Sequence, residues 1–323
     1  PINLFETFSI DKNCWVRNSE KESFVSEIIF PVFKTAGIKE DFPKERKEVI
    51  KLDTKSRYMD NAAAIPLNAE WRNQFPGQNG WWYLKLYYNS VNSDRLLGEN
   101  IYFLCEELLK RKYIDLFFFI RYADPKPHIR LRIHLCEKNM DGDLISVWMQ
   151  KMYAELNISS CKIDVYEREI ERYGGIELIN YAEKFFYSDS LYVMQLLKCQ
   201  KNDKKNTKIV KAIMGILSLA LCTQISVGNL ENLLSEMVDK KKYREIYHEQ
   251  RKEILRIIIN TRHNIIEDNL EFIQIYHWRK RMFEQYWREI VKQDDDLKLS
   301  NSRRNILFSI IHMFCNRYFG DTE

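Results

Sequence analysis

The clearest pattern of hydrophobic and polar positions lies in residues 128–135, where the two kinds alternate strictly. The apolar positions are Ile129, Leu131, Ile133 and Leu135. The alternate positions carry two imidazoles and two guanidiniums, from His128, Arg130, Arg132 and His134. A period of two predicts a β-strand with one buried face. Two arginines side by side on a rigid strand make forks suited to a carboxylate or a phosphate, although a solvated basic face explains the pattern equally well.

The pattern on both sides of this strand predicts alternating strands and helices. Strands are expected over residues 82–88, 114–122, 128–136 and 161–166. Helices are expected over residues 95–111, after a capping Asp94, and over residues 144–156. The order strand, helix, strand, strand, helix, strand is typical of an α+β fold, the ferredoxin-like split βαβ arrangement with an antiparallel sheet. Its helices would cover the apolar face of the 128–135 strand and leave the two arginines on the other face.

The remainder of the chain predicts a helical region. Helical spacing is found over residues 175–198, 208–226, 230–238, 243–262, 270–293 and 303–318. This region is expected to cover the open face of the sheet and to close a cleft. We therefore divide the chain into an N-terminal extension (1–80), a ferredoxin-like core (81–173) and a helical region (174–323), the last two forming one catalytic domain. Within the extension, Lys21 to Ala36 has helical spacing as far as Pro31.

Composition and charge exclude several classes of protein. The chain has 323 residues, of which 45% are hydrophobic and 30% charged, so it can bury a substantial core. Its 50 basic and 46 acidic residues are interleaved, so neither nucleic-acid binding nor a polybasic membrane patch is expected. The most apolar run, residues 212–222, is too short to span a bilayer, and no signal peptide is evident. Seven isolated cysteines without metal-ligand spacing fit the cytoplasm, and no cofactor or metal is expected.

Two further motifs carry candidate chemistry. Glu169 and Arg172 are three residues apart beside a Gly-Gly pair, so they share one face of a helical turn. Taken alone, this pair would be a weak ion pair. His312 lies in an apolar helical stretch, where a single histidine is more often a core residue than a catalyst. The strand histidines, His128 and His134, are expected to flank a site rather than act in it.

Four separated blocks of the sequence resemble one known family. In chain order, the blocks are WWYLKLYY, IDLFFFIRYADPKPHIRLRIH, YEREIERYGG followed by FYSDS, and IHMFCNRYFG. From residue 81 to residue 320, the chain resembles the C-terminal domain of class I lantibiotic dehydratases, a family that includes separate thiopeptide biosynthesis proteins. In the full-length enzymes, the N-terminal domain transfers glutamate from glutamyl-tRNA to Ser or Thr of a precursor peptide. The C-terminal domain then eliminates glutamate and leaves dehydroalanine or dehydrobutyrine.

The resemblance implies that this chain is a separate elimination subunit, a lyase, because it is too short to hold the glutamylation domain as well. The implied partners are a precursor peptide with its leader, a separate tRNA-dependent glutamylating subunit and, as is common in the family, a second copy of the chain. The implied catalytic residues are Arg130, Arg132, Glu169, Arg172 and His312. By this resemblance, Arg130 and Arg132 bind and polarise the substrate, Glu169 orients Arg172, and His312 transfers a proton. The group that removes the Cα proton stays undecided.

Two alternatives remain open. Thiopeptide pyridine synthases share the fold and join two dehydroalanines in a formal cycloaddition that releases the leader peptide. They are expected to lack the Glu/Arg/His set, because they handle no glutamate. A non-catalytic scaffold for the glutamylating partner would have no reason to keep buried charges, which are costly when unpaired. A single cavity lined by the five implied residues would favour an enzyme.

Overall fold

The computed structural model describes residues 16–17, 23–24, 69–88, 93–136, 142–155, 158–198, 205–223, 225, 244–263 and 269–320. The chain divides into two compact units, residues 1–53 and residues 54–323. In the first unit, β1 (Val16–Arg17) pairs with β2 (Ser23–Phe24) in an antiparallel hairpin. The helix expected from Lys21 is therefore wrong at residues 23–24, since a short apolar run fits either period. Most of that stretch, and the helix expected over residues 230–238, lie outside the described residues.

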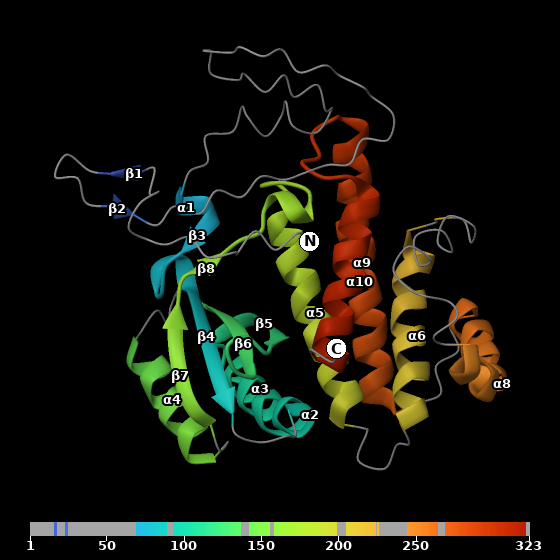
Figure 1. Cartoon of the computed structure of the whole chain (residues 1–323), viewed down its shortest axis with the longest axis horizontal. Coiled ribbons are helices and arrows are strands. Elements are labelled where there is room, and N and C mark those ends of the chain that lie inside the picture. The colour runs from blue at the N-terminus through green and yellow to red at the C-terminus, as the bar shows by residue number, and fades with distance from the viewer. Residues whose placement is uncertain are drawn as a thin grey trace. The chain divides into compact units, whose positions relative to one another are not determined.

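A four-stranded antiparallel sheet forms one side of the second unit, beside the long helices (Figure 1). Its strands are β4 (Trp81–Tyr88), β5 (Ile114–Tyr122), β6 (His128–Leu135) and β7 (Ile158–Asp164). Their order in the sheet is β5-β6-β4-β7. The helical segments between them are α2 (Ser93–Arg95), the π-helix η2 (Leu96–Ile101), α3 (Tyr102–Lys110) and α4 (Gly142–Glu155). The predicted order of strands and helices is confirmed, with boundaries that differ by a few residues.

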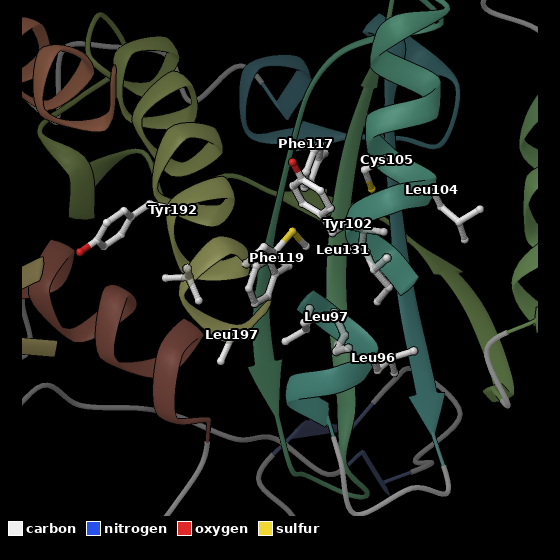
Figure 2. Packing of buried hydrophobic residues seen from close by; sticks show 14 of the residues in the cluster. Leu96, Leu97, Tyr102, Leu104, Cys105, Phe117, Phe119, Leu131, Tyr192 and Leu197 are labelled. Carbon is white, nitrogen blue, oxygen red and sulfur yellow. The ribbon is translucent and has the colours of Figure 1, made fainter. Parts of the chain in front are cut away.

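The two faces of β6 have the different environments that its alternation predicts. Ile129, Leu131 and Ile133 are fully buried in a cluster with apolar residues of η2, α3 and α4. Figure 2 shows labelled members of this cluster, which come from η2, α3, β5, β6 and α5 (Ile179–Lys198). On the other face, Arg130 lies opposite Lys85 and Ile120, and Arg132 lies opposite Tyr83 and Phe118.

The helices after residue 174 form the second part of this unit. They are α5, α6 (Lys205–Cys222), α8 (Arg244–Arg262), α9 (Leu270–Asp295) and α10 (Arg303–Phe319). The prediction that they cover the face of the sheet needs correction, because α5 and α10 make most of their sheet contacts with β5 (Figure 1). The reason is chemical: Phe118 of β5 packs in one apolar cluster with residues of α5, α9 and α10, so the helices cover the β5 side of the arginine-bearing face. Arg130 and Lys85, farther along that face, line a cavity instead.

Helix α10 and helix α5 satisfy the outer edge of β5. The side chain of Asn316 accepts from the backbone N–H of Arg121 and donates to its carbonyl, both at 3.0 Å. Nε of Arg317 donates to the carbonyl of Phe119 at 2.8 Å, and Oγ of Ser190 accepts from the N–H of Phe119 at 3.3 Å. An edge strand otherwise presents unpaired backbone groups. These bonds therefore fix α10 beside the sheet, which sets the position of every side chain on that helix.

A buried charge network joins the helices to one another. Asp189 of α5 is fully buried and binds Nε of Arg279 at 2.7 Å and Nη1 of Arg317 at 2.9 Å. Arg279 also donates to Oγ of Ser218 and to the carbonyl of Gly215 on α6. The arginines of α9 and α10 thus meet at one carboxylate of α5, and Arg279 links the network to α6. A buried carboxylate of this kind is tolerated because it is paired.

Candidate active site

A cavity of about 910 Å³ lies over the arginine-bearing face of the sheet. Strands β4 and β6, the segment that follows β7, and helix α10 supply its walls. All five residues that the sequence nominates line it, namely Arg130, Arg132, Glu169, Arg172 and His312. The structure therefore brings together groups separated by up to 182 positions in the chain, since His312 and Arg130 face the same space.

Arg132 is the more deeply buried of the two strand arginines, with 9% of its surface exposed. Its guanidinium lies among three aromatic rings, 4.5 Å from the centroid of Tyr83, 5.4 Å from that of Tyr166 and 5.7 Å from that of Phe118. Nη1 donates to the carbonyl of Arg130 at 3.3 Å, while the buried Nε has no hydrogen-bond partner among the residues that the structure describes. Burial lowers the pKa of Arg132, yet an arginine stays cationic in proteins. A buried cation with an unused donor is suited to receive an anion.

Arg130 also lines the cavity and is half-buried, so it is more exposed than Arg132. Its guanidinium stacks over the ring of Tyr122 at 3.4 Å from the centroid, and its Nε donates to Nε2 of His128 at 3.2 Å. Within the described part of the chain, neither Arg130 nor Arg132 forms an ion pair with a carboxylate. Two neighbouring guanidiniums therefore face the cavity without a resident counter-ion.

Glu169 lies between β8 (Tyr166–Glu167) and the short 3-10 helix η4 (Glu171–Tyr173), and Arg172 lies within η4. Nη1 of Arg172 donates to Oε1 of Glu169 at 3.0 Å, and Nη2 contacts Sδ of Met313 on α10 at 3.9 Å. Gly174 ends this turn with φ of 102°, and a Cβ there would lie 2.6 Å from Cδ1 of Leu178. The Gly-Gly pair thus allows a close approach of the backbone to Leu178 that a larger residue would prevent. It also delays the start of α5 to Ile179, four residues later than expected.

His312 is exposed to the cavity rather than buried in the helical core. Its neighbours in sequence, Ile311 and Met313, are buried, so the imidazole occupies the polar edge of an otherwise apolar helix. His312 and Asn316 are four residues apart and share one face of α10. Because Asn316 is bound to the edge of β5, the same face directs His312 toward the sheet. No hydrogen bond joins His312 to any residue that the structure describes.

Several lining residues were missed in the sequence. Tyr83 and Lys85 alternate with Leu84 and Leu86 in β4, and this alternation is a signal that could have placed them on the arginine-bearing face. Lys85 forms an ion pair with Asp164. Arg72 and Phe75 come from the N-terminal segment, where the sequence contains no recognisable pattern. They reach the cavity because β3 (Asn73–Gln74) pairs with β8.

Arg168 was also missed, although it lies inside the YEREIER motif. Its Nε and Nη2 donate to the buried carboxylate of Glu183 at 2.7 and 2.9 Å. The hydroxyl of Tyr166 donates to the same carboxylate at 2.9 Å. Burial, and then the charge of Glu183, raise the pKa of Tyr166, so its phenol stays protonated. Tyr166 and Arg168 of this hydrogen-bonded cluster line the cavity.

The two strand histidines do not line the cavity. His128 and His134 lie at opposite ends of β6, on the same face as the arginines, and therefore flank the site. Nδ1 of His134 binds Asp115 at 2.7 Å, and its Nε2 binds the carbonyl of Asn79 at 3.0 Å. Burial lowers the pKa of His134, but the bond and charge of Asp115 raise it by more, so the net direction is upward.

The described residues also bear on membrane-spanning helices and on metal sites. None of the helices in this part of the chain is long and apolar enough to cross a membrane. No group of three or more His, Cys, Asp or Glu side chains within the described ranges could hold a metal ion.

Comparison with curated proteins finds three biosynthetic proteins of related sequence. The chain is 26% identical to the nisin biosynthesis protein NisB of Lactococcus lactis subsp. lactis, over 99% of this chain and 29% of that protein. It is 29% identical to the subtilin biosynthesis protein SpaB of Bacillus subtilis, over 82% of this chain and 26% of that protein. It is also 23% identical to the epidermin biosynthesis protein EpiB of Staphylococcus epidermidis, over 99% of this chain. The chain thus spans less than a third of the curated relatives it matches.

Comparison with solved structures and with family profiles agrees with these relatives. The fold is similar to that of the tRNA-dependent lantibiotic dehydratase MibB from Microbispora sp. 107891, with a TM-score of 0.61, 20% identity and coverage of 75% of this chain and 26% of that one. The profile described as lantibiotic biosynthesis dehydratase, C-terminal, matches residues 81–323. Since this match covers well over half of the sequence, the chain belongs to the lantibiotic biosynthesis dehydratase C-terminal family.

Proposed function

We propose that this chain eliminates glutamate from glutamylated Ser or Thr residues of a precursor peptide, which leaves dehydroalanine or dehydrobutyrine. One observation carries the proposal: two neighbouring guanidiniums, without a carboxylate partner in the described part of the chain, face a cavity that also receives an exposed imidazole. Unpaired buried cations are costly, so a protein that keeps them has a use for their charge.

The chemistry of the substrate matches this charge. A glutamyl ester carries one free carboxylate, and the esterified carboxyl becomes a second carboxylate when glutamate leaves. Arginine forks bind carboxylates through paired, charge-assisted hydrogen bonds. In the reaction, a base takes the proton from Cα, the electron pair of that C–H bond becomes the Cα=Cβ double bond, and the Cβ–O bond breaks. Glutamate departs with the electron pair of the broken bond. Negative charge that develops next to Cα is stabilised by cations held in advance in a water-poor cavity.

Each residue then has a distinct role. Arg130 and Arg132 bind the glutamyl group and polarise the ester, because they are the guanidiniums that no carboxylate occupies. Arg172 adds a third cation, and Glu169 holds it through the 3.0 Å bond. His312 transfers a proton at the reacting centre, since its imidazole faces the cavity and a ring nitrogen can accept or donate a proton. No cofactor enters this scheme.

The proposal also implies partners and a subdomain. The substrate is a precursor peptide bearing its leader, and its glutamylation from glutamyl-tRNA is the task of a separate activity. We further propose that the sheet, with α3 and α4, forms the ferredoxin-like split βαβ unit. The element order and the strand order β5-β6-β4-β7 support that description.

The purified chain incubated with a glutamylated precursor peptide provides the test. Mass spectrometry of the peptide is expected to show the loss of one glutamic acid per modified Ser or Thr. An unchanged glutamylated peptide, together with release of the leader from a precursor that already carries dehydroalanines, would indicate a pyridine synthase. An unchanged peptide, with the glutamylating partner present as well as absent, would indicate a scaffold.

A further inference from the structure

His128 makes two hydrogen bonds that use both nitrogens of its ring. The side chain is buried, with 1% of its surface exposed, at the first position of β6. Nε2 lies 3.2 Å from Nε of Arg130, and Nδ1 lies 2.8 Å from the carbonyl oxygen of Lys126. The ring stacks on Tyr87 with centroids 4.7 Å apart and contacts Tyr122 at 5.6 Å. Its position and orientation are therefore fixed on several sides.

These bonds define the tautomer of His128. Nε of an arginine always carries a hydrogen, so it donates and Nε2 of His128 accepts. Nδ1 must then carry the ring proton, which it donates to the carbonyl of Lys126. The imidazole is neutral, and its lone pair points at the guanidinium of Arg130.

The consequence for Arg130 is that one edge of its guanidinium is used internally. Nε is bound to His128, and the plane rests on the ring of Tyr122 at 3.4 Å. The terminal nitrogens, Nη1 and Nη2, are the donors that remain to meet a ligand end-on. A long, flexible side chain is thereby held in one orientation before any ligand arrives, which lowers the entropy lost on binding.

We propose that His128 is a positioning residue that aims the terminal fork of Arg130 into the cavity. The nature of the ligand, a glutamyl carboxylate, rests on the proposed function. The orientation of Arg130 by His128 does not depend on the proposed function.

Two substitutions at position 128 separate this role from a purely structural one. In His128→Gln, the side-chain oxygen reaches the place of Nε2 and can accept from Arg130, but the bond to Lys126 is lost. In His128→Asn, the amide nitrogen takes the place of Nδ1 and keeps the bond to Lys126, but nothing reaches Arg130. If His128 positions Arg130, His128→Asn is expected to lower kcat/KM for glutamate elimination about 10-fold, whereas His128→Gln is expected to keep most of the wild-type value. In an Arg130→Lys background, His128→Asn is expected to cause no further loss of kcat/KM. If His128→Asn retained activity and His128→Gln lost it, His128 would serve only to anchor the turn at Lys126, and the proposal would be overturned.

A measurement without substrate tests the same contact. Nitrogen-15 NMR of histidine-labelled protein, with the His128 resonances assigned by their loss in His128→Asn, is expected to show protonated Nδ1 and bare Nε2. Arg130→Lys should shift the Nε2 resonance and leave that of Nδ1 nearly unchanged. A protonated Nε2, or an Nε2 resonance indifferent to Arg130, contradicts the proposal. If wild-type protein eliminates no glutamate while these NMR results hold, the proposed function fails and the positioning role stands. His248→Gln, on the exposed face of α8, is the matched control that should change neither readout.

Discussion

Most cations that line the cavity are already neutralised by the protein. Lys85 pairs with Asp164, Arg172 with Glu169, and the remaining pairs are Arg72–Glu171, Arg168–Glu183 and Arg317–Asp189. Arg130 and Arg132 differ, because aromatic rings, a neutral imidazole and a carbonyl oxygen are their neighbours in the described structure. Such neighbours orient a guanidinium without cancelling its charge. The capacity of the cavity for an anion therefore resides in these two residues.

Replacement of Arg132 by Lys tests whether this guanidinium gives the cavity its capacity to bind an anion. The charge is kept, but the planar fork and its contact with the rings of Tyr83 and Tyr166 are lost. One charge-assisted hydrogen bond is worth about 1.5–3 kcal/mol. We therefore expect kcat/KM for glutamate elimination to fall by about 10- to 100-fold. Arg95→Lys, at an exposed pair with Glu99, is the control and should leave the rate unchanged. Wild-type kinetics in Arg132→Lys would mean that charge alone, without fork geometry, suffices.

His134 provides a pH-dependent prediction at the same scale. Its pKa in the folded protein lies above the ordinary value of 6.5. Burial is the largest single cause and lowers the pKa, but the bond and charge of Asp115, the bond to Asn79 and the charge of Glu183 together outweigh it. A raised pKa means that the folded state binds the proton more tightly, so the contribution to stability is complete below pH 6.5 and is lost as the pH rises through the folded pKa. Since the pair is partly exposed, solvent limits its worth to about 0.5 kcal/mol.

Urea unfolding of wild-type protein and His134→Gln at pH 6 and pH 9 measures this effect. The free energy of unfolding lost in the variant is expected to be larger at pH 6 than at pH 9. A difference that is constant, or that grows with pH, contradicts the assignment. His248→Gln serves as the reference for a histidine outside any such pair.

At the scale of elements, periodicity predicted most of what is seen. Strands β4 to β7 and the long helices lie within a few residues of their expected positions, because each has one face in the core. Two details could not be predicted from the sequence. A π-helix over Leu96–Ile101 replaces part of an expected α-helix, where Gly98 lets this segment approach the backbone of Lys198 on α5. The packing of α10 against the edge of β5 depends on Asn316 and Arg317, which resemble ordinary polar positions in the sequence.

Asn316→Ala tests whether this edge contact holds α10. The change removes two hydrogen bonds to the backbone of Arg121 and is expected to lower the free energy of unfolding by about 1–2 kcal/mol. The rate of elimination should fall as well, because His312 lies on the same face of the helix. Asn305→Ala, at an exposed position of the same helix, is expected to cost less than about 0.5 kcal/mol. Equal stability of the two variants would show that the edge contact contributes little.

At the scale of the whole second unit, the site depends on contacts that one sequence cannot reveal. Family resemblance nominated five of the residues that line the cavity, and of these five, alternation alone placed only the two arginines on one face. The sequence offered no means to foresee that Asp189 would join Arg279 and Arg317 and so fix α5, α9 and α10 around one carboxylate. It also gave no sign that Arg72 and Phe75 would reach the cavity, because the pairing of β3 with β8 involves two residues on each strand. Short pairings of this kind leave no periodic pattern.

The central claim is that this cavity performs an elimination, and the fate of the Cα hydrogen tests it most directly. A precursor peptide deuterated at Cα of its glutamylated Ser is incubated with the protein, and the peptide is weighed by mass spectrometry. We predict that glutamate and the deuteron are lost together, because formation of the double bond requires both to leave. Release of glutamate from a peptide that keeps its deuteron would show hydrolysis of the ester to serine, and would contradict the mechanism proposed for Arg130, Arg132 and His312.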